Sequence, residues 1–344
     1  MNENARAFNG PRVVDQPVVR AVRIHAPGST SALVVEDVDV AAPAPGEVRV
    51  RHTAIGVNFI DVYHRTGVYP LPLPAILGGE AAGVVVDVGP GVAHFAPGAR
   101  VAYAAKAPGA YVEQRNLPAR HLIALPDDIP DDVAAAVLLK GLTAEYLLRR
   151  TFRVDARHAI VVHAAAGGVG SLLCQWARVL GARVIGLVST DDKARTALQA
   201  GAHHVLVTAP GETATSLAQR ERELAPDGVD VVYDSVGKDT FTGSLDMIKP
   251  RGMLALFGQS SGPVMPLDPA LLGRKGSLFL TRPTLFDYIA DPGEYRAAAD
   301  ALFDVIRRGV VKPTISARYP LADAARAHAD LESRKTTGSL ILLP

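Results

Sequence analysis

The feature that most constrains the fold of this 344-residue chain is a glycine-rich turn at residues 163–170. The apolar run at residues 159–162 precedes the turn and predicts a buried parallel strand, and apolar residues at helical spacing follow it. Strand, glycine turn and helix in this order form the first half of a dinucleotide-binding unit, because glycines let the backbone approach a pyrophosphate. The G-x-G-x-x-G template is met at Gly167 and Gly170 but not at Ala165, so an ordinary strand-to-helix turn is the alternative.

The rest of the chain predicts an α/β fold with an additional β-rich part. Over residues 19–125, short alternating strands separated by glycine and proline turns predict a small barrel or sandwich. Beyond Asp127, strands alternate with helices, which predicts a doubly wound parallel sheet covered on both faces. The first of these helices is expected to have Asp131 or Asp132 as its N-cap. A last apolar strand, Ser339–Leu343, is expected to return to the β-rich part.

Composition argues against several classes of function. A formal net charge of +1 provides no general attraction to nucleic acid or to anionic membranes. The single cysteine, Cys174, cannot form an internal disulfide or a cysteine-rich zinc site, and it is expected to be a buried helix residue. No apolar run approaches the ~18 residues that a membrane-spanning helix needs. Residues 1–18 predict a flexible N-terminal extension rather than a signal peptide, so a cytoplasmic protein is expected.

The segment after the second strand of the alternating region indicates which dinucleotide binds. In NAD-specific units, an acidic side chain about 20 residues beyond the glycines binds the ribose 2′-hydroxyl. Here Ser189, Thr190 and Lys193 offer two hydroxyls and a cation, which suit a 2′-phosphate. Asp191 or Asp192 could instead bind the ribose, but Thr190 is typical of an N-cap and would place both acids in the first turn of a helix. NADPH is therefore the expected cofactor.

Eight motifs are spread through the chain in a characteristic order. They are NFIDVY at 58–63, LGGEAAG at 77–83, LKGLT at 139–143, HAAAGGVG at 163–170, YDSVG at 233–237, FGQSSG at 257–262, T-R-P at 281–283 and LESR at 331–334. Together they resemble the zinc-free quinone oxidoreductases, the zeta-crystallin-like group of the medium-chain dehydrogenase/reductase superfamily. The resemblance implies a GroES-like catalytic domain formed by residues 19–140 and 285–344. It also implies a Rossmann NADPH-binding domain at residues 141–284, with the cofactor in the cleft between the two.

The resemblance also implies the site residues. Those expected at the nicotinamide and its ribose are Asn58, Lys140 and Thr143. Those expected at the pyrophosphate are Gly167, Gly168, Val169 and Gly170. Those expected around the 2′-phosphate are Ser189, Lys193 and Arg334, and those lining the groove are Ser235, Phe257 and Ser260. Tyr63, Tyr69 and Arg282 are expected at the substrate opening, with Asn58, Tyr63 and Thr143 as the candidate catalytic residues. Thr208 departs from the family, which often has a tyrosine nearby, and this could weaken NADPH binding.

The sequence predicts no catalytic metal. Zinc alcohol dehydrogenases of the same superfamily have a Gly-His-Glu motif, and here Gly79 occupies the position of the ligand histidine. The adjacent His203 and His204 are expected to face solvent rather than to form a ligand pair. Without a metal to polarise an oxygen, an acceptor that is already electrophilic is favoured. A quinone is the first choice and an α,β-unsaturated carbonyl compound the second, with Tyr63 or water as the proton donor.

Two other classes of function compete with a reductase. Gly258–Gly262 matches the G-x-S-x-G motif of hydrolases, with Asp300 and His328 downstream in the matching order, although the prolines after Ser260 disfavour the helix that such a motif must open. A non-enzymatic role in NADPH sensing or RNA binding is the other alternative, although no nucleic-acid-binding motif is visible. A homodimer is the family expectation, and the apolar residues 278–280 could form an edge strand at its interface.

Overall fold

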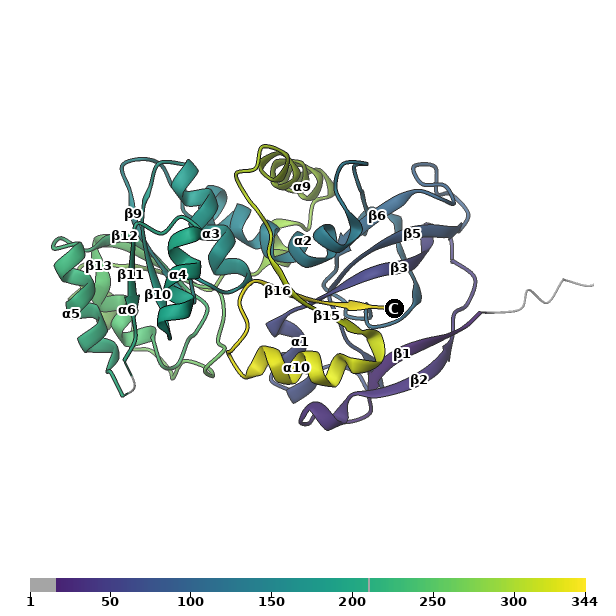
Figure 1. The fold of residues 1–344 in the computed structure, drawn as a ribbon, viewed down its shortest axis with the longest axis horizontal. Helices are drawn as coiled ribbons and strands as arrows, with labels where there is room; N and C mark the ends of the chain where they lie inside the picture. The colour runs from purple at the N-terminus through teal and green to yellow at the C-terminus, as the bar shows by residue number, and fades with distance from the viewer. Residues whose placement is uncertain (1–16, 210) are drawn as a thin grey trace, which may run out of the picture.

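The computed structural model describes residues 17–209 and 211–344 and divides into two lobes (Figure 1). One lobe, teal to green in Figure 1, is built on a parallel six-stranded sheet in the order β11-β10-β9-β12-β13-β14. Its strands are β9 (Ala159–His163), β10 (Arg183–Val188), β11 (His204–Val207), β12 (Val229–Asp234), β13 (Ile248–Leu256) and β14 (Phe279–Thr281). In chain order this is the 3-2-1-4-5-6 arrangement of a Rossmann fold, which opens a crevice at the carboxyl ends of β9 and β12.

Helices cover both faces of this sheet, because buried side chains of its strands point alternately to either side. Ile160 and Val162 pack in the same core as α2, α3 and α4, whereas Val161 packs with α5 and α6 on the opposite face. The helices of this lobe and its border are α2 (Asp131–Tyr146), α3 (Gly168–Val179), α4 (Asp191–Gln199), α5 (Ala214–Leu224), α6 (Phe241–Met247), α7 (Ala270–Arg274), α8 (Leu285–Tyr288) and α9 (Pro292–Arg307). Cys174 is buried in α3, as its position in the sequence predicts.

The other lobe is rich in β-structure and contains both ends of the described chain. A seven-stranded sheet combines β3 (Glu47–Val57), β5 (Glu80–Val88), β6 (Arg100–Ala104), β7 (Gln114–Pro118), β8 (Ile123–Ala124), β15 (Ile315–Pro320) and β16 (Ser339–Leu343). A three-stranded sheet combines β1 (Val18–Ile24), β2 (Val34–Asp39) and β4 (Ala75–Ile76). The yellow β15 and β16 lie beside the purple and blue N-terminal strands (Figure 1), because β16 pairs with β3. The final strand therefore returns to the β-rich lobe, as expected.

Two helices and several short turns complete the junction of the lobes. Helix α1 (Phe59–Thr66) directly follows β3, and α10 (Ala324–Glu332) precedes the crossing back to β16. The single-turn elements are η1 (Thr30–Ala32), η2 (Ala119–His121) and η4 (Leu321–Asp323), and α2 continues into the wider turn η3 (Leu147–Thr151). None of the helices in the described ranges is long and apolar enough to cross a membrane.

The structure bears on two expected segment ends, the start of α2 and the N-terminal extension. The N-cap of α2 is Pro130, and Asp131 and Asp132 are already in the first helical turn, so the prediction that one of them caps the helix was wrong. Both carboxylates still favour the helix start, because they lie at the positive end of its dipole. The expected extension over residues 1–18 lies outside the described residues except for Pro17 and Val18, and Val18 already belongs to β1. The exact domain boundaries stay a prediction.

Candidate active site

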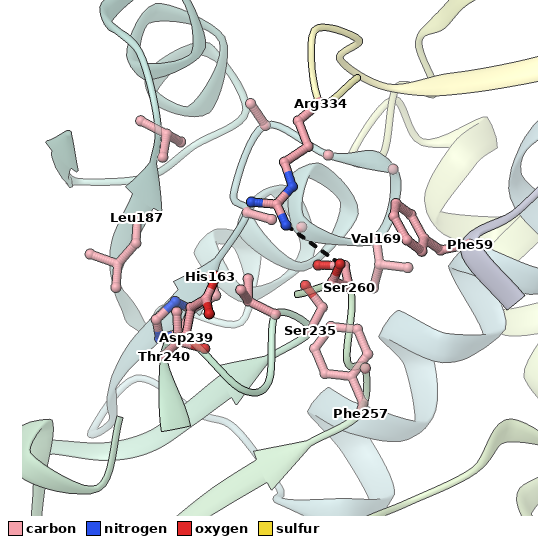
Figure 2. Close-up of a pocket in the computed structure, with 18 of the residues that line it drawn as sticks. Phe59, His163, Val169, Leu187, Ser235, Asp239, Thr240, Phe257, Ser260 and Arg334 are labelled. Atoms are coloured by element: carbon pink, nitrogen blue, oxygen red, sulfur yellow. Dashed lines mark hydrogen bonds between the residues drawn. The ribbon is translucent and has the colours of Figure 1, made fainter. Parts of the chain in front are cut away.

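One cavity of about 820 Å³ lies between the two lobes, at the carboxyl ends of β9, β10 and β12. Figure 2 shows part of its lining, with Val169, Ser235, Phe257 and Ser260 gathered near the side chain of Arg334. All residues that the sequence assigns to a site line this cavity. They are Asn58, Tyr63, Tyr69, Lys140, Thr143, Gly167, Gly168, Val169, Gly170, Ser189, Lys193, Ser235, Phe257, Ser260, Arg282 and Arg334. The fold thus brings together segments from both lobes, while the individual roles of these residues stay predictions.

The glycine turn joins β9 to α3 at the centre of the cavity. Gly167 is the N-cap of α3, so the first N–H groups of a twelve-residue helix begin there. A Cβ at Gly170 would lie 2.2 Å from the carbonyl oxygen of Ala164, so only glycine permits this close approach. Ala164 itself adopts a left-handed φ of 49°, which is strained for a residue with a side chain. Gly338 donates a hydrogen bond to the carbonyl oxygen of Ala166 (3.1 Å), so the C-terminal segment crosses the turn.

The side chains of two cations, Lys193 and Arg334, line the cavity. Lys193 donates hydrogen bonds from Nζ to the carbonyl oxygen of Arg334 and to Ser189 Oγ. In the part of the chain that the structure describes, neither cation forms an ion pair with a carboxylate. Burial, followed by the charge of Arg334, lowers the pKa of Lys193. Thr190 accepts a hydrogen bond from the backbone N–H of Lys193, which makes it the N-cap of α4, as predicted. Asp191 and Asp192 accordingly occupy the first turn of that helix.

A buried polar group lies on the side of the cavity formed by β3, α1 and α2. The side chains of Asn58 and Lys140 line the cavity and both donate to Oε1 of Glu80, at 2.7 and 3.1 Å. Glu80 Oε2 accepts the backbone N–H of Leu139 at 2.7 Å. Thr143 donates its hydroxyl proton to the carbonyl oxygen of Leu139 (2.8 Å), so its oxygen is left to act as an acceptor. The sequence motifs include Glu80 but give no sign of its partners.

Two tyrosines and an arginine form another part of the cavity wall. The backbone N–H of Gln259 donates to Tyr63 Oη at 3.0 Å, which leaves the hydroxyl proton of Tyr63 available to another acceptor. Burial is the main cause that raises the pKa of Tyr63, so the phenol stays protonated well above neutral pH. Arg282 donates to the carbonyl oxygen of Leu256 (3.0 Å) and to Tyr69 Oη (3.2 Å). The rings of Tyr63 and Tyr69 meet edge to face, with centroids 5.1 Å apart.

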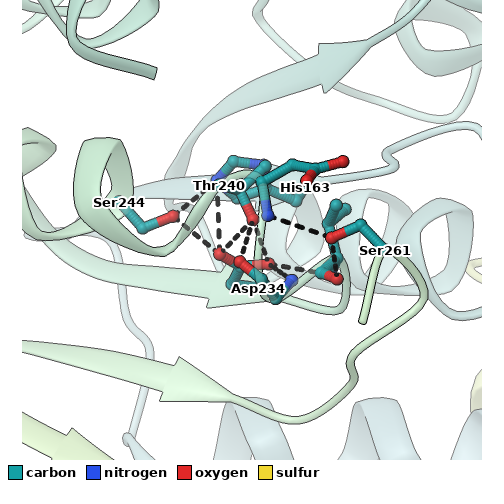
Figure 3. Close-up of polar contacts among 8 residues, drawn as sticks. His163, Asp234, Thr240, Ser244 and Ser261 are labelled. Carbon is teal, nitrogen blue, oxygen red and sulfur yellow. Dashed lines mark hydrogen bonds and ion pairs between the residues drawn. The ribbon is translucent and has the colours of Figure 1, made fainter. Parts of the chain in front are cut away.

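A second polar network at the strand ends was missed by reasoning from the sequence (Figure 3). Asp234, at the end of β12, accepts hydrogen bonds from the hydroxyls of Thr240 and Ser244. Ser244 is also hydrogen-bonded to Nε2 of His163 (2.9 Å), the residue that opens the glycine turn. The network therefore connects the turn after β9 to the turn after β12. The sequence signal for this network is that the buried strands β9 and β12 both end in a polar residue.

Comparison with known proteins identifies the family. A family model described as "Alcohol dehydrogenase GroES-like domain" matches residues 44–148, and one described as "Zinc-binding dehydrogenase" matches residues 168–302. The chain is 48% identical over 330 residues to a quinone oxidoreductase of Pseudomonas aeruginosa, covering 95% of this chain and 100% of the relative. The chain belongs to the quinone oxidoreductase family. This family is part of the medium-chain dehydrogenase/reductase superfamily, with a GroES-like domain and a Rossmann domain.

Two further relatives of the quinone oxidoreductase family bear on the site. The structure of an Escherichia coli quinone oxidoreductase complexed with NADPH matches with a TM-score of 0.91 and 46% identity, covering 94% of this chain and 100% of that chain. A 2-haloacrylate reductase of a Burkholderia species is 46% identical, covering 95% of this chain and 99% of the relative.

The cavity of this quinone oxidoreductase family member fits NADPH. A Cβ at Gly168 would lie 2.8 Å from Cδ of Lys140, and one at Gly170 would meet Ala164, so the turn presents bare backbone where a pyrophosphate needs it. The paired cations Lys193 and Arg334 suit the charge of a 2′-phosphate. Thr208 also lines the cavity, and its backbone N–H donates to the carbonyl oxygen of Val188, while its expected effect on NADPH binding stays a prediction.

The description "Zinc-binding dehydrogenase" raises the question of a zinc site, and the described residues contain no ligand set for one. In the described ranges, no group of three or more histidine, cysteine, aspartate or glutamate side chains could hold a metal ion. His203 and His204 are both exposed, and the ring of His203 accepts a hydrogen bond from the backbone N–H of Val184. These residues therefore do not fit a zinc site.

The hydrolase alternative is wrong. Both ring nitrogens of His328 are engaged elsewhere, Nδ1 with Arg65 (3.1 Å) and Nε2 with Tyr111 (3.0 Å). The segment after Ser260 does not open a helix, and the next one, α7, begins only at Ala270. A nucleophile elbow needs a strand followed directly by a helix, so the G-x-S-x-G match is a coincidence of sequence.

Proposed function

We propose that this chain is an NADPH-dependent oxidoreductase that reduces quinones in the cavity between its two lobes. The observation that carries the proposal is the continuity of that cavity, which joins the Lys193–Arg334 pair, the glycine turn and the wall formed by Tyr63 and Tyr69. Membership of the quinone oxidoreductase family, and the NADPH complex of the Escherichia coli relative, support the same reaction.

The cofactor would be held by residues along the whole cavity. Lys193 and Arg334 bind the 2′-phosphate, the backbone of the glycine turn binds the pyrophosphate, and Asn58 and Lys140 orient the nicotinamide end. When bound, NADPH supplies the hydride. Thr143 contributes a hydroxyl oxygen that acts only as an acceptor, because its proton is given to Leu139. Because NADPH supplies the hydride, the protein contributes by positioning the reactants and by stabilising the charge that develops on the acceptor.

Tyr63 is the side chain best placed to help the acceptor. A quinone is electrophilic without activation, so the protein mainly has to orient it and to stabilise the negative charge that develops on its oxygen. The N–H of Gln259 makes the Tyr63 oxygen an acceptor on one side, and the hydroxyl proton of Tyr63 is then directed to another partner. We assign Tyr63 the role of hydrogen-bond donor to that oxygen, and Tyr69 and Arg282 the role of lining the opening.

Parallel kinetics test this proposal. Oxidation of NADPH would be followed with 1,4-benzoquinone, 9,10-phenanthrenequinone and a 2-alkenal, and saturable turnover of both quinones is expected. Saturable turnover of the alkenal alone would overturn quinone reduction as the principal activity. A protein that binds NADPH but oxidises it with none of these acceptors would instead favour a non-enzymatic, NADPH-sensing role.

A second candidate function is the reduction of α,β-unsaturated acids or carbonyl compounds. Two observations favour it: the 46% identical relative is a 2-haloacrylate reductase, and Arg282 lies at the opening without a carboxylate partner in the described part of the chain. Only two of its five N–H groups are used, so it can bind a substrate carboxylate. In the test, 2-chloroacrylate is compared with its methyl ester, in the wild type and in Arg282→Leu. If the variant loses activity toward the free acid and keeps activity toward the ester, the result supports this candidate with Arg282 as the carboxylate-binding residue. An equal effect of the substitution on both compounds would contradict that role of Arg282, and no turnover of either compound would contradict the candidate.

The proposal includes a cytoplasmic homodimer. The buried, lone Cys174 suits a reducing compartment. Strand β14 lies at the edge of the parallel sheet and Phe279 is 60% exposed, so pairing with a second copy would cover an apolar edge. Sedimentation of the wild type and of Phe279→Lys tests this, because the variant should shift the protein from dimer to monomer. A monomeric wild type would contradict the dimer.

A further inference from the structure

Glu80, the first residue of β5, has no exposed surface, and its hydrogen-bond partners among the described residues are three donors. Its Oε1 accepts from Asn58 Nδ2 and Lys140 Nζ, and its Oε2 accepts from the N–H of Leu139. A carboxylate offers about four acceptor sites, so it satisfies all three donors, which a neutral amide of the same size does not. The two carboxyl oxygens of Glu80 therefore provide an acceptor for each of the three donors.

The surrounding backbone also holds Glu80 in one place. A Cβ at Gly56 would lie 2.2 Å from Glu80 Oε1 and 2.3 Å from the carbonyl oxygen of Ala135. The carboxylate is thus seated directly against bare backbone of β3. A glycine at this point in a strand interior weakens the strand, and its benefit here is the room that it leaves for Glu80.

Stability alone does not account for such a group. Burying an ion pair costs more than burying apolar side chains of similar volume, which often stabilise a protein at least as well. The Glu80 carboxylate accepts hydrogen bonds from two side chains that belong to different parts of the fold, and it thereby holds them next to each other. Asn58 is the N-cap of α1, Lys140 lies in α2, and both line the cavity.

We propose that Glu80 is a positioning residue, whose carboxylate fixes the Asn58 amide and the Lys140 ammonium in the orientation that receives the nicotinamide end of NADPH. This inference rests on the proposed function for the location of that end. Because Nδ2 of Asn58 is held by Glu80, the amide cannot flip. Because only one of the three N–H groups of Lys140 is used by Glu80, the other two are left for further acceptors.

The first test is Glu80→Gln, which retains size but removes the charge. Its NH₂ group must face either Lys140 or the N–H of Leu139, so one contact becomes a clash of donors. NADPH should still bind, with a dissociation constant within about 3-fold of wild type, because the glycine turn and the cation pair are intact. The emission of bound NADPH should shift, since its nicotinamide ring is held differently, and kcat should fall on the order of 10- to 100-fold.

A matched control separates positioning from a general structural role. Glu145 is a comparably buried glutamate on the same helix as Lys140, and it pairs with Arg149 and Arg150 without lining the cavity. Glu145→Gln should lower the midpoint of thermal unfolding about as much as Glu80→Gln does, with the emission of bound NADPH and kcat unchanged.

The outcomes are decisive in both directions. Unchanged emission and kcat in Glu80→Gln, or equal changes in Glu145→Gln, would overturn the inference. If Glu80→Gln fails to fold, the change is made in a Lys140→Met background, which removes the uncompensated charge. The emission of bound NADPH should then differ between the double variant and Lys140→Met alone, because Asn58 also loses its fixed partner, and identical emission of the two would overturn the inference. A wild type that binds NADPH but reduces no acceptor would refute the proposed function alone, because the comparison of emission requires no acceptor.

Discussion

Lys193 donates a hydrogen bond from Nζ to the carbonyl oxygen of Arg334, although 141 residues separate the two in sequence. Arg334 lies just beyond α10 and adopts a left-handed φ of 57°, where glycine is the usual residue. This conformation costs on the order of 1–2 kcal/mol for an arginine. An arginine therefore occupies a strained position next to a lysine, at the edge of the cavity.

Arg334→Ala should reduce selectivity for NADPH over NADH. Charge-assisted hydrogen bonds contribute about 1.5–3 kcal/mol, so KM for NADPH should rise about 10- to 100-fold while KM for NADH changes little. Steady-state kinetics with both cofactors provide the measurement. Arg195→Ala, an exposed position on α4 that does not line the cavity, is the control and should affect neither constant. An equal rise in both constants would show that Arg334 does not recognise the 2′-phosphate.

Tyr63→Phe should lower kcat for quinones by about 3- to 10-fold, the value of one hydrogen bond, and leave the dissociation constant of NADPH unchanged. The phenylalanine keeps the edge-to-face contact with Tyr69 and removes only the hydroxyl. Because burial raises the pKa of Tyr63, the wild-type donor should stay active as the pH rises to about 10, so no loss of kcat from this group is expected below that pH. Complete inactivation with NADPH binding intact would mean that Tyr63 is an essential proton donor.

Arg65, His328, Tyr111 and Asp61 form a buried series of hydrogen bonds. Two members of this series predict opposing effects of pH on stability. Burial lowers the pKa of His328 to about 3, so the unfolded chain binds more protons up to pH 6.5 and stability rises with pH. Burial raises the pKa of Asp61 to about 7, so the folded protein binds more protons from pH 3.8 upward and stability falls with pH. In the wild type the two effects oppose each other between about pH 4 and 6.5.

Asp61→Asn should remove the Asp61 contribution alone. Its Oδ2 accepts from Tyr111 and from the N–H of Asn58, whereas its Oδ1 has no hydrogen-bond partner among the described residues, so an amide can replace the carboxyl. The free energy of unfolding should then rise more steeply with pH, by up to about 1.4 kcal/mol per pH unit for one proton. Urea unfolding at several pH values in this interval measures the slope. Parallel profiles for variant and wild type would contradict the assignment.

Gly170→Ala should destabilise the protein by about 1–3 kcal/mol and weaken NADPH binding, because the added methyl group meets the backbone of Ala164. Gly273→Ala is the matched control: its Cβ meets nothing within 4 Å, and it lies in α7. That change should be neutral or stabilise by up to about 1 kcal/mol. Thermal unfolding of both variants is the measurement, and similar midpoints for the two would contradict the steric argument.

Patterns that are local in sequence predicted much of this protein. The strand before the glycine turn and Thr190 as an N-cap depend on residues within a few positions of one another. The last strand is visible as a local apolar run, whereas its pairing with β3 joins distant parts of the chain. The positions of Lys140 and Arg334 at the cavity came from family motifs rather than from periodicity. Asp131 shows where local rules fail. Its side chain suits an N-cap, yet the N-cap is Pro130 and Asp131 is the first residue inside the helix.

The partners of the buried polar residues could not be predicted in this way. Arg65 and His328 are 263 residues apart, and Asp61 and Tyr111 are 50 apart. Which donor meets which acceptor depends on how segments distant in sequence pack together, and a polar residue in an apolar segment indicates only that some partner exists. Glu80 illustrates this. A sequence motif includes it, but its three hydrogen-bond partners lie in two other segments of the chain and could not be read from that motif.

The pairing of β16 with β3 has a consequence for how the protein is made. Residues 55–57 of β3 pair with residues 340–342, so this part of the strand has an open edge until residues 340–342 have left the ribosome. At 5–20 residues per second this takes roughly 15–60 s, during which the inserted parallel-sheet lobe can already fold. Asn58 follows β3 directly, so the cavity between the lobes is completed last, and shortening the C-terminus by a few residues should leave a folded Rossmann lobe beside an incomplete partner.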